Sequence, residues 1–443
     1  MEKVLELLKS NRLVEARDEL INKNVVDIAQ LLEEVESNQL LIIFRILPKD
    51  IASEVFSHIP SEQKKYIIES ITDREISGIM DELFLDDTVD FIEEMPATVV
   101  KRVLKNTDEH KRKLINQYLR YPENSAGSIM TIEYVDLKKE MTVRQAINYI
   151  KKTGVNKETI NICYVIDNNR ELDGIVSIRD LILGDEEAKL EDIMYTNIIY
   201  VNTLDDQEEV AALFRKYDFI SMPVVDKEKR LVGIITIDDV VDIIEEENTE
   251  DFHKMAAIEP SEEPYLKTGV FKLAKHRIIW LLVLMISATF TGNIIKKYND
   301  VLQSVVVLAA FIPMLMDTGG NAGSQSSTLV IRGLALGEIE LKDIFKVVWK
   351  ELRVSLIVGI VLSLANFVRI YYLEGTSFKI AVTVSISLVS TVILAKVVGG
   401  VLPIIAKKFK LDPAIMASPL ITTIVDAFAL IIYFTTATIL LGI

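Results

Sequence analysis

Cysteine and histidine are scarce in this sequence, and their scarcity excludes several kinds of site. Cys163 is the single cysteine among 443 residues, so the chain can form neither an internal disulfide nor a zinc site built from cysteines. Histidine occurs four times, and the sequence contains no Walker loop, no HExxH segment and no serine–histidine pair suited to nucleophilic catalysis. We therefore expect a protein that is not an enzyme.

Positive charge is also sparse, and its distribution divides the chain. Residues 1–276 hold 35 Lys and Arg against 56 Asp and Glu, a net charge of −21, whereas residues 277–443 hold 14 against 9, a net of +5. The acidic part disfavours nucleic acid as a partner and suits a cation, although a merely solvated acidic surface would have the same composition. The opening residues, MEKVLELLKS, lack the apolar core of a signal peptide, so we expect this part to stay in the cytosol.

Residues 1–124 are predicted to be a helical domain. Apolar residues recur there at helical spacing. Pro48, Pro60 and Pro96 fall at multiples of 12 residues, each just after an apolar residue and before a polar helix start. This spacing indicates a small superhelix of short helices joined by tight turns. Proline is compatible with the first turn of a helix.

Residues 125–250 contain an internal repeat. Met130 aligns with Met194, and Gly174 aligns with Gly233. Each copy is predicted to run strand, helix, strand, turn, strand, helix, because β-branched runs are broken by charged turns. The repeat resembles a tandem pair of cystathionine-β-synthase (CBS) domains. This resemblance implies that the two copies pack as one pseudo-symmetric unit.

The C-terminal part is expected to be a membrane domain, residues 277–443, reached through a connecting helix and linker, residues 244–276. Five apolar stretches approach or exceed the roughly 20 residues that cross a bilayer. They are 278–296, 302–331, 354–373, 378–405 and 414–442. Basic residues gather before the first, between the second and third, and between the fourth and fifth. This distribution predicts a cytosolic N-terminus and an external C-terminus.

Two polar interruptions, residues 311–335 and 411–434, carry the acids Asp317 and Asp426 inside otherwise apolar spans. A charge near mid-bilayer costs at least about 2.5–3.5 kcal/mol, so each carboxylate should face a cavity or the protein interior. A structural ion pair with Lys396 is the alternative that the sequence leaves open. In the first interruption, the glycines permit close backbone approach or local unwinding, and the adjacent amide and hydroxyl oxygens favour a pore-side role over simple helix packing.

Both interruptions resemble the pore motifs of the MgtE family of magnesium transporters, and the order of domains matches that family along essentially the whole chain. The matching residues are Gly319, Gly320, Asn321, Gly323, Gln325, Asp412, Pro413, Ala414, Pro419, Thr423 and Asp426. The sequence departs from the family pattern at Ala429, where a glycine is common, and at Ser418, where some members carry asparagine.

The resemblance implies a homodimer in the lipid bilayer with one pore on its two-fold axis. Each subunit would place one Asp426 carboxylate at the ion path, and a pair of carboxylates suits Mg²⁺, which keeps several of its waters. Ser418 and Thr422 share the helical face of Asp426 and are expected to contact those waters, with Asp412 also at the pore. The expected pore-lining residues are Asp317, Gly320, Asn321 and Gln325. We expect Asp317 to be secondary to Asp426.

The acidic cytosolic part is expected to sense Mg²⁺ and close the pore. Like-charged carboxylates repel when the domains approach, and a bound cation reverses that repulsion. For each candidate, a solvated surface position is the alternative. The regulatory candidates are Glu54, Asp86, Asp90, Asp206, Glu208, Asp218, Asp239, Asp242, Glu247, Glu250 and Asp251.

The CBS repeats offer a second candidate site, for an adenine nucleotide such as ATP. The residues at positions that bind adenosine ribose and phosphate in other CBS domains, or that assist there, are Ser177, Arg179, Asp180, Phe219, Thr236 and Asp239. The acids among them are also well placed to cap the helices that follow. Capping therefore stays open as their role.

The sequence thus predicts a multidomain protein: an all-α superhelical N-domain, an α/β tandem CBS pair and an all-α domain of five transmembrane helices. The function expected is a Mg²⁺-selective channel or transporter of the plasma membrane, gated by cytosolic Mg²⁺. Transport of another cation, such as Co²⁺, Mn²⁺ or Na⁺, is one alternative, because carboxylates alone do not select among hard cations. A membrane-anchored receptor or enzyme that responds to adenine nucleotide is the other.

Overall fold

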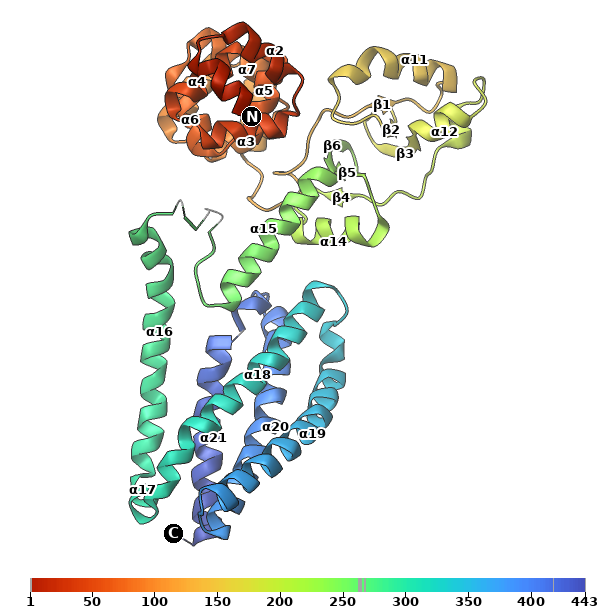
Figure 1. Ribbon diagram of the computed structural model, residues 1–443. Coiled ribbons are helices and arrows are strands. Elements are labelled where there is room, and N and C mark those ends of the chain that lie inside the picture. The colour runs from red at the N-terminus through yellow and green to blue at the C-terminus, as the bar shows by residue number, and fades with distance from the viewer. Residues whose placement is uncertain (1, 262–264, 267, 417, 443) are drawn as a thin grey trace. The chain divides into compact units, whose positions relative to one another are not determined.

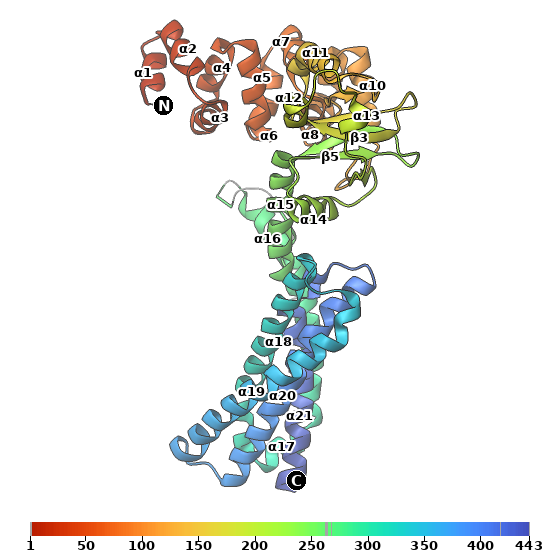
Figure 2. The ribbon, with the colours of Figure 1, turned by 90° about the vertical axis from the view of Figure 1, so that its right-hand side faces the viewer.

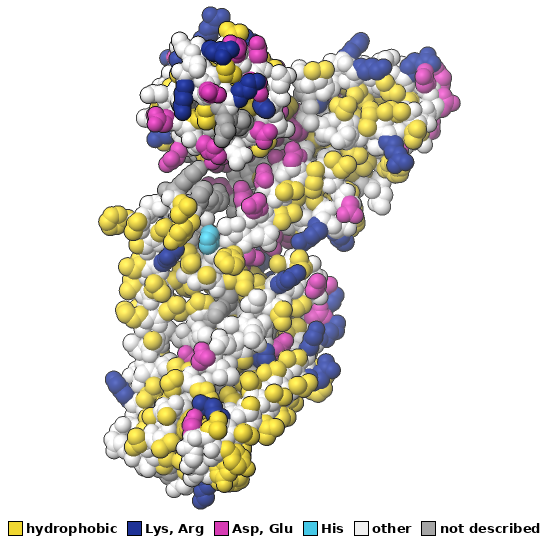
Figure 3. Space-filling model, viewed as in Figure 1, with side chains coloured by type: hydrophobic (Ala, Val, Ile, Leu, Met, Phe, Trp, Pro, Cys, Tyr) yellow, Lys and Arg dark blue, Asp and Glu magenta, His cyan; other side chains and the backbone are white. Residues whose placement is uncertain are grey.

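The computed structural model describes residues 2–261, 265–266, 268–416 and 418–442, with the side chains of Glu2 and Ser418 left undescribed. It divides into two compact units, Met1–Ile244 and Glu245–Ile443. Hydrophobic side chains dominate the visible face of the second unit, whereas charged side chains gather over the first (Figure 3). This contrast is the one that the charge distribution of the sequence predicts.

The first unit begins with ten short helices. They are α1 (Glu2–Lys9), α2 (Leu13–Ile21), α3 (Val25–Glu34), α4 (Ser37–Ile46), α5 (Lys49–His58), α6 (Ser61–Ser70), α7 (Asp73–Glu82), α8 (Leu85–Glu93), α9 (Ala97–Asn106) and α10 (Glu109–Tyr118). Alternate helices pack on one another, α3 on α5, α5 on α7 and α7 on α9, as they wind along the domain (Figure 2). The superhelix expected from the 12-residue spacing is therefore present.

The prolines of the 12-residue spacing stand one position before each helix rather than inside its first turn. Pro48, Pro60 and Pro96 are the N-cap residues of α5, α6 and α9. Proline has no amide hydrogen to satisfy there and fixes the extended entry of the chain. Between the helices lies an apolar core in which the rings of Phe56 and Phe91 meet edge to face, 5.2 Å between centroids.

Two small mixed sheets follow, one in each copy of the repeat. The first copy contains β1 (Asp136–Leu137), α11 (Val143–Thr153), β2 (Ile162–Ile166), β3 (Leu172–Ser177) and α12 (Ile178–Leu183). After α13 (Leu190–Ile193), the second contains β4 (Val201–Asn202), α14 (Gln207–Tyr217), β5 (Ser221–Val225), β6 (Leu231–Thr236) and α15 (Ile237–Met255). In each sheet the first two strands are parallel and the last two antiparallel. This is the element order expected for a CBS pair.

The two copies interlock through their aligned methionines and glycines. Met194, which opens the second copy, covers Gly174 of the first, and a Cβ on that glycine would lie 2.6 Å from the methionine sulfur. Reciprocally, Met130 covers Gly233, where a Cβ would lie 2.7 Å from the sulfur. Each glycine leaves the space that the other copy's methionine fills, so the pair folds as one body.

Among its described residues, the second unit contains five helical segments long and apolar enough to cross a membrane. Its elements are α16 (Val270–Lys297), α17 (Asn299–Ser304), η2 (Val306–Phe311), α18 (Ile312–Ala335), η3 (Leu341–Asp343), α19 (Ile344–Val368), η4 (Arg369–Leu373), α20 (Phe378–Lys408), η5 (Pro413–Met416) and α21 (Ser418–Leu441). The third segment begins about ten residues earlier than the hydropathy pattern predicts, because the basic stretch before it is also helical. The chain is thus a membrane protein in its C-terminal part.

Helices α18, α20 and α21 form the centre of this unit (Figures 1 and 2). α19 packs on α20, and α16 packs on α21. At the crossing of α18 and α20, a Cβ on Gly399 would collide with the backbone of Gly323, whose carbonyl carbon would be 2.9 Å away. The crossing therefore depends on glycine for its closeness, and α18 remains a continuous helix through its glycine-rich stretch.

Candidate functional site

A stripe of polar side chains runs along the surface of α18. Asp317, Asn321, Gln325 and Thr328 are all exposed in the single chain, although α18 belongs to a membrane span. Their spacing of four, four and three residues places them on one face of the helix. Polar groups at this depth are tolerated where they line water or face protein. This face therefore needs cover other than lipid.

The opposite face of α18 packs on α20 and α21 through its glycines. A Cβ on Gly319 would lie 2.9 Å from Val425, and one on Gly320 would collide with Thr422. Gly320, which the sequence suggested as pore-lining, is thus buried against α21 within the chain. The glycines set the closeness of the two helices, and the polar side chains beside them form the exposed stripe.

Asp426 lies on α21, partly exposed, and close enough to Asp317 for the two charges to interact. The structure therefore brings together the two intramembrane acids that the sequence singled out. Thr422, one turn earlier, donates its hydroxyl to the Pro419 carbonyl at 2.9 Å. The Ser418 side chain, proposed from the sequence as an ion contact, lies outside the described part of the structure.

Lys396, which the sequence left open as a partner of Asp426, points elsewhere. It is 5% exposed and donates a hydrogen bond to Ser326 Oγ of α18, 3.5 Å away. The Ser326 hydroxyl in turn donates to Glu351 of α19 at 2.6 Å. The ion-pair alternative for Asp426 therefore gains no support from the described contacts of Lys396.

A first carboxylate cluster lies in the N-terminal unit, where α8 approaches the second CBS copy. Asp86, Asp87 and Asp90 of α8 interact electrostatically with Asp239 of α15, and Glu158 joins them from the loop after α11. The sequence named Asp86, Asp90 and Asp239. It missed Asp87, which is adjacent to Asp86, and Glu158, whose loop carries no recognisable signal.

The acids of this cluster resist ionisation. Desolvation raises the pKa of Asp239 to about 6, and the nearby charges of Asp238, Asp87 and Asp242 add to the shift. It also raises the pKa of Glu158 to about 7, again reinforced by acidic neighbours. The Thr236 hydroxyl donates to Asp239 at 2.8 Å and opposes the rise. Bringing these groups together as anions therefore costs free energy.

The pKa values of Asp86 and Asp90 on α8 are also raised. Burial, then the charges of Asp87 and Asp239, raises the pKa of Asp86 well above its ordinary value. The pKa of Asp90 rises to about 7 through desolvation and the same acidic neighbours. Asp90 is nevertheless exposed at the surface, so solvent screens part of this effect. Asp86, Asp239 and Glu158 are half-buried and less screened by solvent, so they carry the argument.

A second cluster lies in the C-terminal unit, where the last turns of α15 meet the segment before α21. Lys254 Nζ is 2.6 Å from Asp412 Oδ2 and also pairs with Glu250. Desolvation, followed by the charge of Asp412, raises the pKa of Asp251 to about 6. Glu247 adds to the negative charge around Asp251. Asp412, expected at the pore from the sequence, is thus held by the connecting helix.

Within the residues that the structure describes, no three Asp, Glu, His or Cys side chains are arranged to hold one metal ion. The two clusters therefore crowd negative charge without converging on a point. Such crowding is the condition under which an added cation stabilises a compact arrangement.

Family models match most of the chain. Residues 312–436 match the MgtE divalent cation transporter domain, residues 23–124 the MgtE intracellular N domain, and residues 126–185 and 190–246 the CBS domain. The magnesium transporter MgtE of Thermus thermophilus is 36% identical over 94% of this chain and 92% of its own length. The chain belongs to the MgtE family. The family is one of transporters, as expected from the lack of catalytic motifs.

Two further comparisons support this membership. The magnesium transporter MgtE of Bacillus subtilis is 33% identical over 98% of this chain and 96% of its own length. The crystal structure of the cytosolic domain of the Mg²⁺ channel MgtE in complex with ATP superposes with a TM-score of 0.52 and 35% identity, covering 54% of this chain and 98% of that one. The crystal structure of the soluble part of a magnesium transporter superposes with a TM-score of 0.53 and 28% identity, covering 56% of this chain and 97% of that one.

In this MgtE chain, two of the residues suggested for nucleotide binding also cap a helix. Ser177 and Asp180 form a reciprocal capping box at the start of α12, with the serine hydroxyl 2.6 Å from the carboxylate. Arg179 is exposed beside them. Phe219 stacks on Tyr217, 5.4 Å between ring centroids. Capping alone explains the serine and the aspartate, so these contacts do not require a nucleotide.

The remaining regulatory candidates of this MgtE chain occupy separate positions. Glu54 is exposed on α5, and Asp218 ends α14 in a left-handed conformation with φ of 53°. Asp206 caps α14, and Glu208 lies in its first turn. Asp242 lies one turn beyond Asp239 on α15, where its charge contributes to the first cluster.

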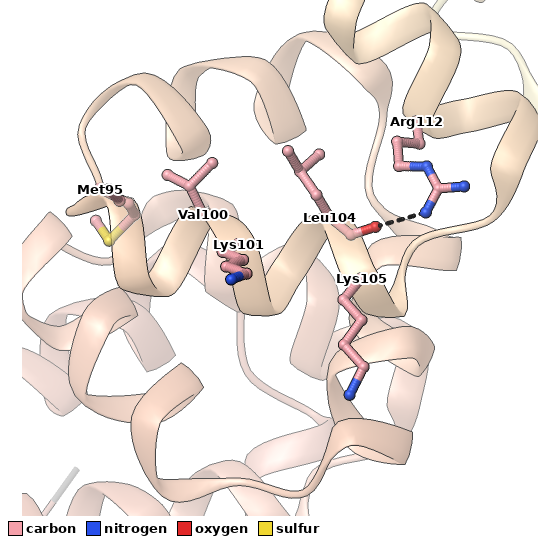
Figure 4. Close-up of a pocket in the computed structure, with 7 residues that line it drawn as sticks. Met95, Val100, Lys101, Leu104, Lys105 and Arg112 are labelled. Atoms are coloured by element: carbon pink, nitrogen blue, oxygen red, sulfur yellow. Dashed lines mark hydrogen bonds between the residues drawn. The ribbon is translucent and has the colours of Figure 1, made fainter.

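The N domain also carries a concavity that differs from the acidic clusters (Figure 4). Its volume is about 670 Å³, and Arg112 donates a hydrogen bond to the Leu104 carbonyl at its edge, 3.4 Å away. The lining residues are Met95, Ala97, Val100, Lys101, Leu104, Lys105 and Arg112. This basic and apolar surface is unsuited to a cation.

Proposed function

We propose that this MgtE-family protein is a Mg²⁺-selective channel of the plasma membrane, which conducts as a homodimer and closes when cytosolic Mg²⁺ binds its acidic clusters. The observation that carries the proposal is the exposed polar stripe on α18 beside Asp426 of α21. The relatives named as magnesium transporters, matched almost end to end, support the choice of ion.

In a homodimer, a second copy of the chain would shield the polar stripe of α18 from lipid. Two copies facing each other across a two-fold axis turn one exposed polar face into a water-filled path, and closed two-fold symmetry is the commonest arrangement of homo-oligomers. Each copy contributes one Asp426, so two carboxylates meet at the axis. Asp317, one helix away, adds negative charge nearby. We retain Asp426 as the principal ion ligand and Asp317 as the secondary one.

The chemistry of Mg²⁺ fits such a path. The ion dehydrates reluctantly and binds through one or two carboxylates while keeping several waters. Hydroxyls and amides around the carboxylates, those of Thr422, Asn321 and Gln325, suit contacts to these waters. Binding through water is weak enough for release, which conduction requires.

The gate would operate through the carboxylate clusters. Without Mg²⁺, mutual repulsion of Asp86, Asp239 and Glu158 opposes a compact cytosolic unit. Mg²⁺ bound there would favour the compact state by its preferential affinity for it. At the other end of α15, Lys254 and Asp412 join the connecting helix to the segment that precedes α21. A movement of α15 would thereby reach the helix that carries Asp426.

The test of the pore is flux through purified protein in proteoliposomes. Asp426→Ala should abolish Mg²⁺ uptake while the protein still folds and dimerises, because the path loses both central carboxylates. Asp300→Ala, at an exposed acid on α17, is the matched control and should conduct normally. Wild-type uptake by Asp426→Ala would refute the assignment. If Asp317→Asn altered the preference for Mg²⁺ over Na⁺ more than Asp426→Asn, the two roles would be reversed.

The test of the gate is limited proteolysis across a Mg²⁺ titration, paired with patch currents from the full chain. Millimolar Mg²⁺ should protect the cytosolic unit and close the pore, and combined Asp86→Asn, Asp239→Asn and Glu158→Gln substitutions should weaken both effects. The proposed gating by the carboxylate clusters fails if this variant gates as the wild type does. Competition of Mg²⁺ flux by Co²⁺ or Mn²⁺ in the same liposomes separates Mg²⁺ selectivity from general divalent transport.

ATP is proposed as a second ligand of the CBS pair, supported by the ATP complex of a related cytosolic domain. Calorimetric titration with ATP, repeated on Asp180→Ala, tests it. Wild-type affinity in that variant would leave Asp180 as a helix cap alone.

A further inference from the structure

A buried polar network crosses the membrane domain on the side of α18 that faces away from the exposed stripe. Lys396 of α20, Ser326 of α18 and Glu351 of α19 form it. Lys396 is 5% exposed and Ser326 is 1% exposed. Three helices thus meet at these side chains, two of them buried and Glu351 half-buried. Ionisable residues in such a place are costly, and they persist where they serve a purpose.

The Ser326 hydroxyl is the centre of this network. It accepts from Lys396 Nζ at 3.5 Å and donates to a Glu351 carboxylate oxygen at 2.6 Å. One hydroxyl therefore bridges a cationic and an anionic group on two other helices. Hydrogen bonds are thus donated in sequence from Lys396 to Ser326 and from Ser326 to Glu351. The opposite charges of the lysine and the glutamate offset part of the free-energy cost of burying each of them.

Gly400 makes room for the glutamate. A Cβ on this glycine would lie 3.1 Å from Glu351 Cγ and 3.2 Å from Val347, so the stem of the glutamate rests against α20. Gly400 lies four residues after Lys396, on the same face of that helix. On α20, Gly400 thus leaves room for the stem of Glu351, and Lys396 supplies the positive charge of the network.

The depth of Lys396 places the network well within the span. It lies 18 residues after the start of α20 and 12 before its end, roughly 27 Å and 18 Å along the helix. A lysine near a helix end extends its amine to the membrane surface, but this one is enclosed by α18 and α19. Its charge therefore acts on its neighbours within the protein.

The network also lies next to the close crossing of α18 and α20. Gly323 and Gly399 meet three residues before Ser326 and three residues after Lys396. Ser326 stands roughly 140° around α18 from Asn321, at 100° per residue. The network therefore contacts α18 on the face away from the stripe, while Asn321 and Gln325 remain on the exposed side.

We propose that Lys396 is a positioning residue of the ion path. Through Ser326 and Glu351 it fixes the rotation of α18 against α19 and α20. The exposed stripe of Asp317, Asn321, Gln325 and Thr328 thereby keeps its place beside Asp426. The inference rests on the proposed function for its effect on flux, but its structural content can be measured without any ion.

The experiment uses the full chain in proteoliposomes. The variants are Lys396→Met, which keeps length and removes charge, Ser326→Ala, which removes the bridge, and Glu351→Gln. Ser387→Ala is the matched control, because this serine is equally buried in α20 and, among the described residues, its hydroxyl donates only to the Thr383 carbonyl of the same helix.

We expect Ser326→Ala and Lys396→Met to lower Mg²⁺ flux per folded protein by about threefold to tenfold, the range of interhelical hydrogen bonds in membranes. Both should shift the Mg²⁺/Na⁺ reversal potential, which a loss of folded protein alone would not move. Lys396→Arg should restore the reversal potential. Lys396→Met combined with Glu351→Gln should cost no more than the worse single change, because the three groups act as a unit.

A labelling measurement separates this proposal from the function of the channel. Cys163 is the only cysteine, so Cys163→Ser with Asn321→Cys gives one thiol on the stripe. Its reaction rate with a water-soluble maleimide should change in Lys396→Met and stay constant in Ser387→Ala. Unchanged labelling and an unchanged reversal potential in both Lys396→Met and Ser326→Ala would overturn the positioning role. If labelling changes but the wild type conducts no Mg²⁺, the proposed function fails and the positioning role of Lys396 stands.

Discussion

Acidifying the cytosolic side from about pH 7.5 to about pH 6 should weaken Mg²⁺ binding at the first carboxylate cluster by about tenfold. The reason is proton competition. The pKa of Glu158 is raised to about 7 and that of Asp239 to about 6, first by desolvation and then by acidic neighbours. Mg²⁺ binds the ionised carboxylates, so protons that these groups retain must leave before the ion can bind.

The magnitude follows from the fraction of each group that is ionised. For Glu158, apparent affinity falls with the factor 1 + 10^(pKa − pH), which changes about eightfold between the two conditions. For Asp239 the same factor changes about twofold. The apparent affinity would fall about eightfold for an ion that needs Glu158 alone, and about sixteenfold for one that needs both carboxylates. Because the groups titrate as a coupled cluster, we take about tenfold as the expected change.

The same shifts determine the stability of the cytosolic unit without Mg²⁺. Since the folded pKa values exceed the ordinary ones near 4, the folded state holds more protons between about pH 4 and about pH 7. The free energy of unfolding should therefore fall as pH rises through that window and remain lower above it. Mg²⁺ should restore the loss at neutral pH.

The assay is protection of the cytosolic unit from proteolysis, titrated with Mg²⁺ at both pH values at constant ionic strength. Glu158→Gln with Asp239→Asn should flatten the pH dependence. Glu62→Gln, at an exposed acid on α6, should leave it unchanged. A midpoint for Mg²⁺ that is the same at both pH values, or lower at the acidic one, would refute the reasoning.

Three further outcomes follow from the packing. Gly399→Ala should lower the melting temperature of the detergent-solubilised protein, since its Cβ meets the Gly323 backbone and overpacking costs about 1–3 kcal/mol; an unchanged melting curve would contradict this close approach. Gly174→Ala should destabilise the CBS pair, and adding Met194→Ala should recover part of the loss, which denaturant titration would show. Lys254→Met should speed hydrogen exchange in the last turn of α15 by about threefold, as expected for a partly exposed ion pair, and equal exchange rates would show that the pair contributes nothing.

Much of the fold could be read from the sequence because its signals are local. Five spans follow from hydropathy, and the CBS copies follow from the alignment of Met130 with Met194 and Gly174 with Gly233. The start of the third span was misplaced for a physical reason. Lys346, Lys350 and Arg353 indicate a loop by charge, yet they continue a helix in which long basic side chains reach solvent. Hydropathy marks the apolar core of a span and not the end of its helix.

The site was harder to predict from the sequence, because its residues come together only through tertiary packing. Asp426 and Asp317 could be named because a carboxylate in an apolar span is conspicuous on its own. Glu158 joins α8 and α15 from a loop, and no periodicity distinguishes it from any solvated glutamate. The bridge from Lys396 to Glu351 spans three helices, with Ser326 at its centre. A serine in an apolar helix has no sequence signature for such a role.

The first span differs from the other four in how it is held. None of the residues of α16 is buried, although an 18-residue window of the helix has a mean hydropathy of 2.1. Its place in the membrane therefore depends on transfer into lipid much more than on fitted neighbours within the chain. Exchanges among leucine, isoleucine, valine and phenylalanine preserve its hydropathy, so α16 should tolerate them, whereas the crossing of α18 and α20 has no room for a Cβ at Gly399.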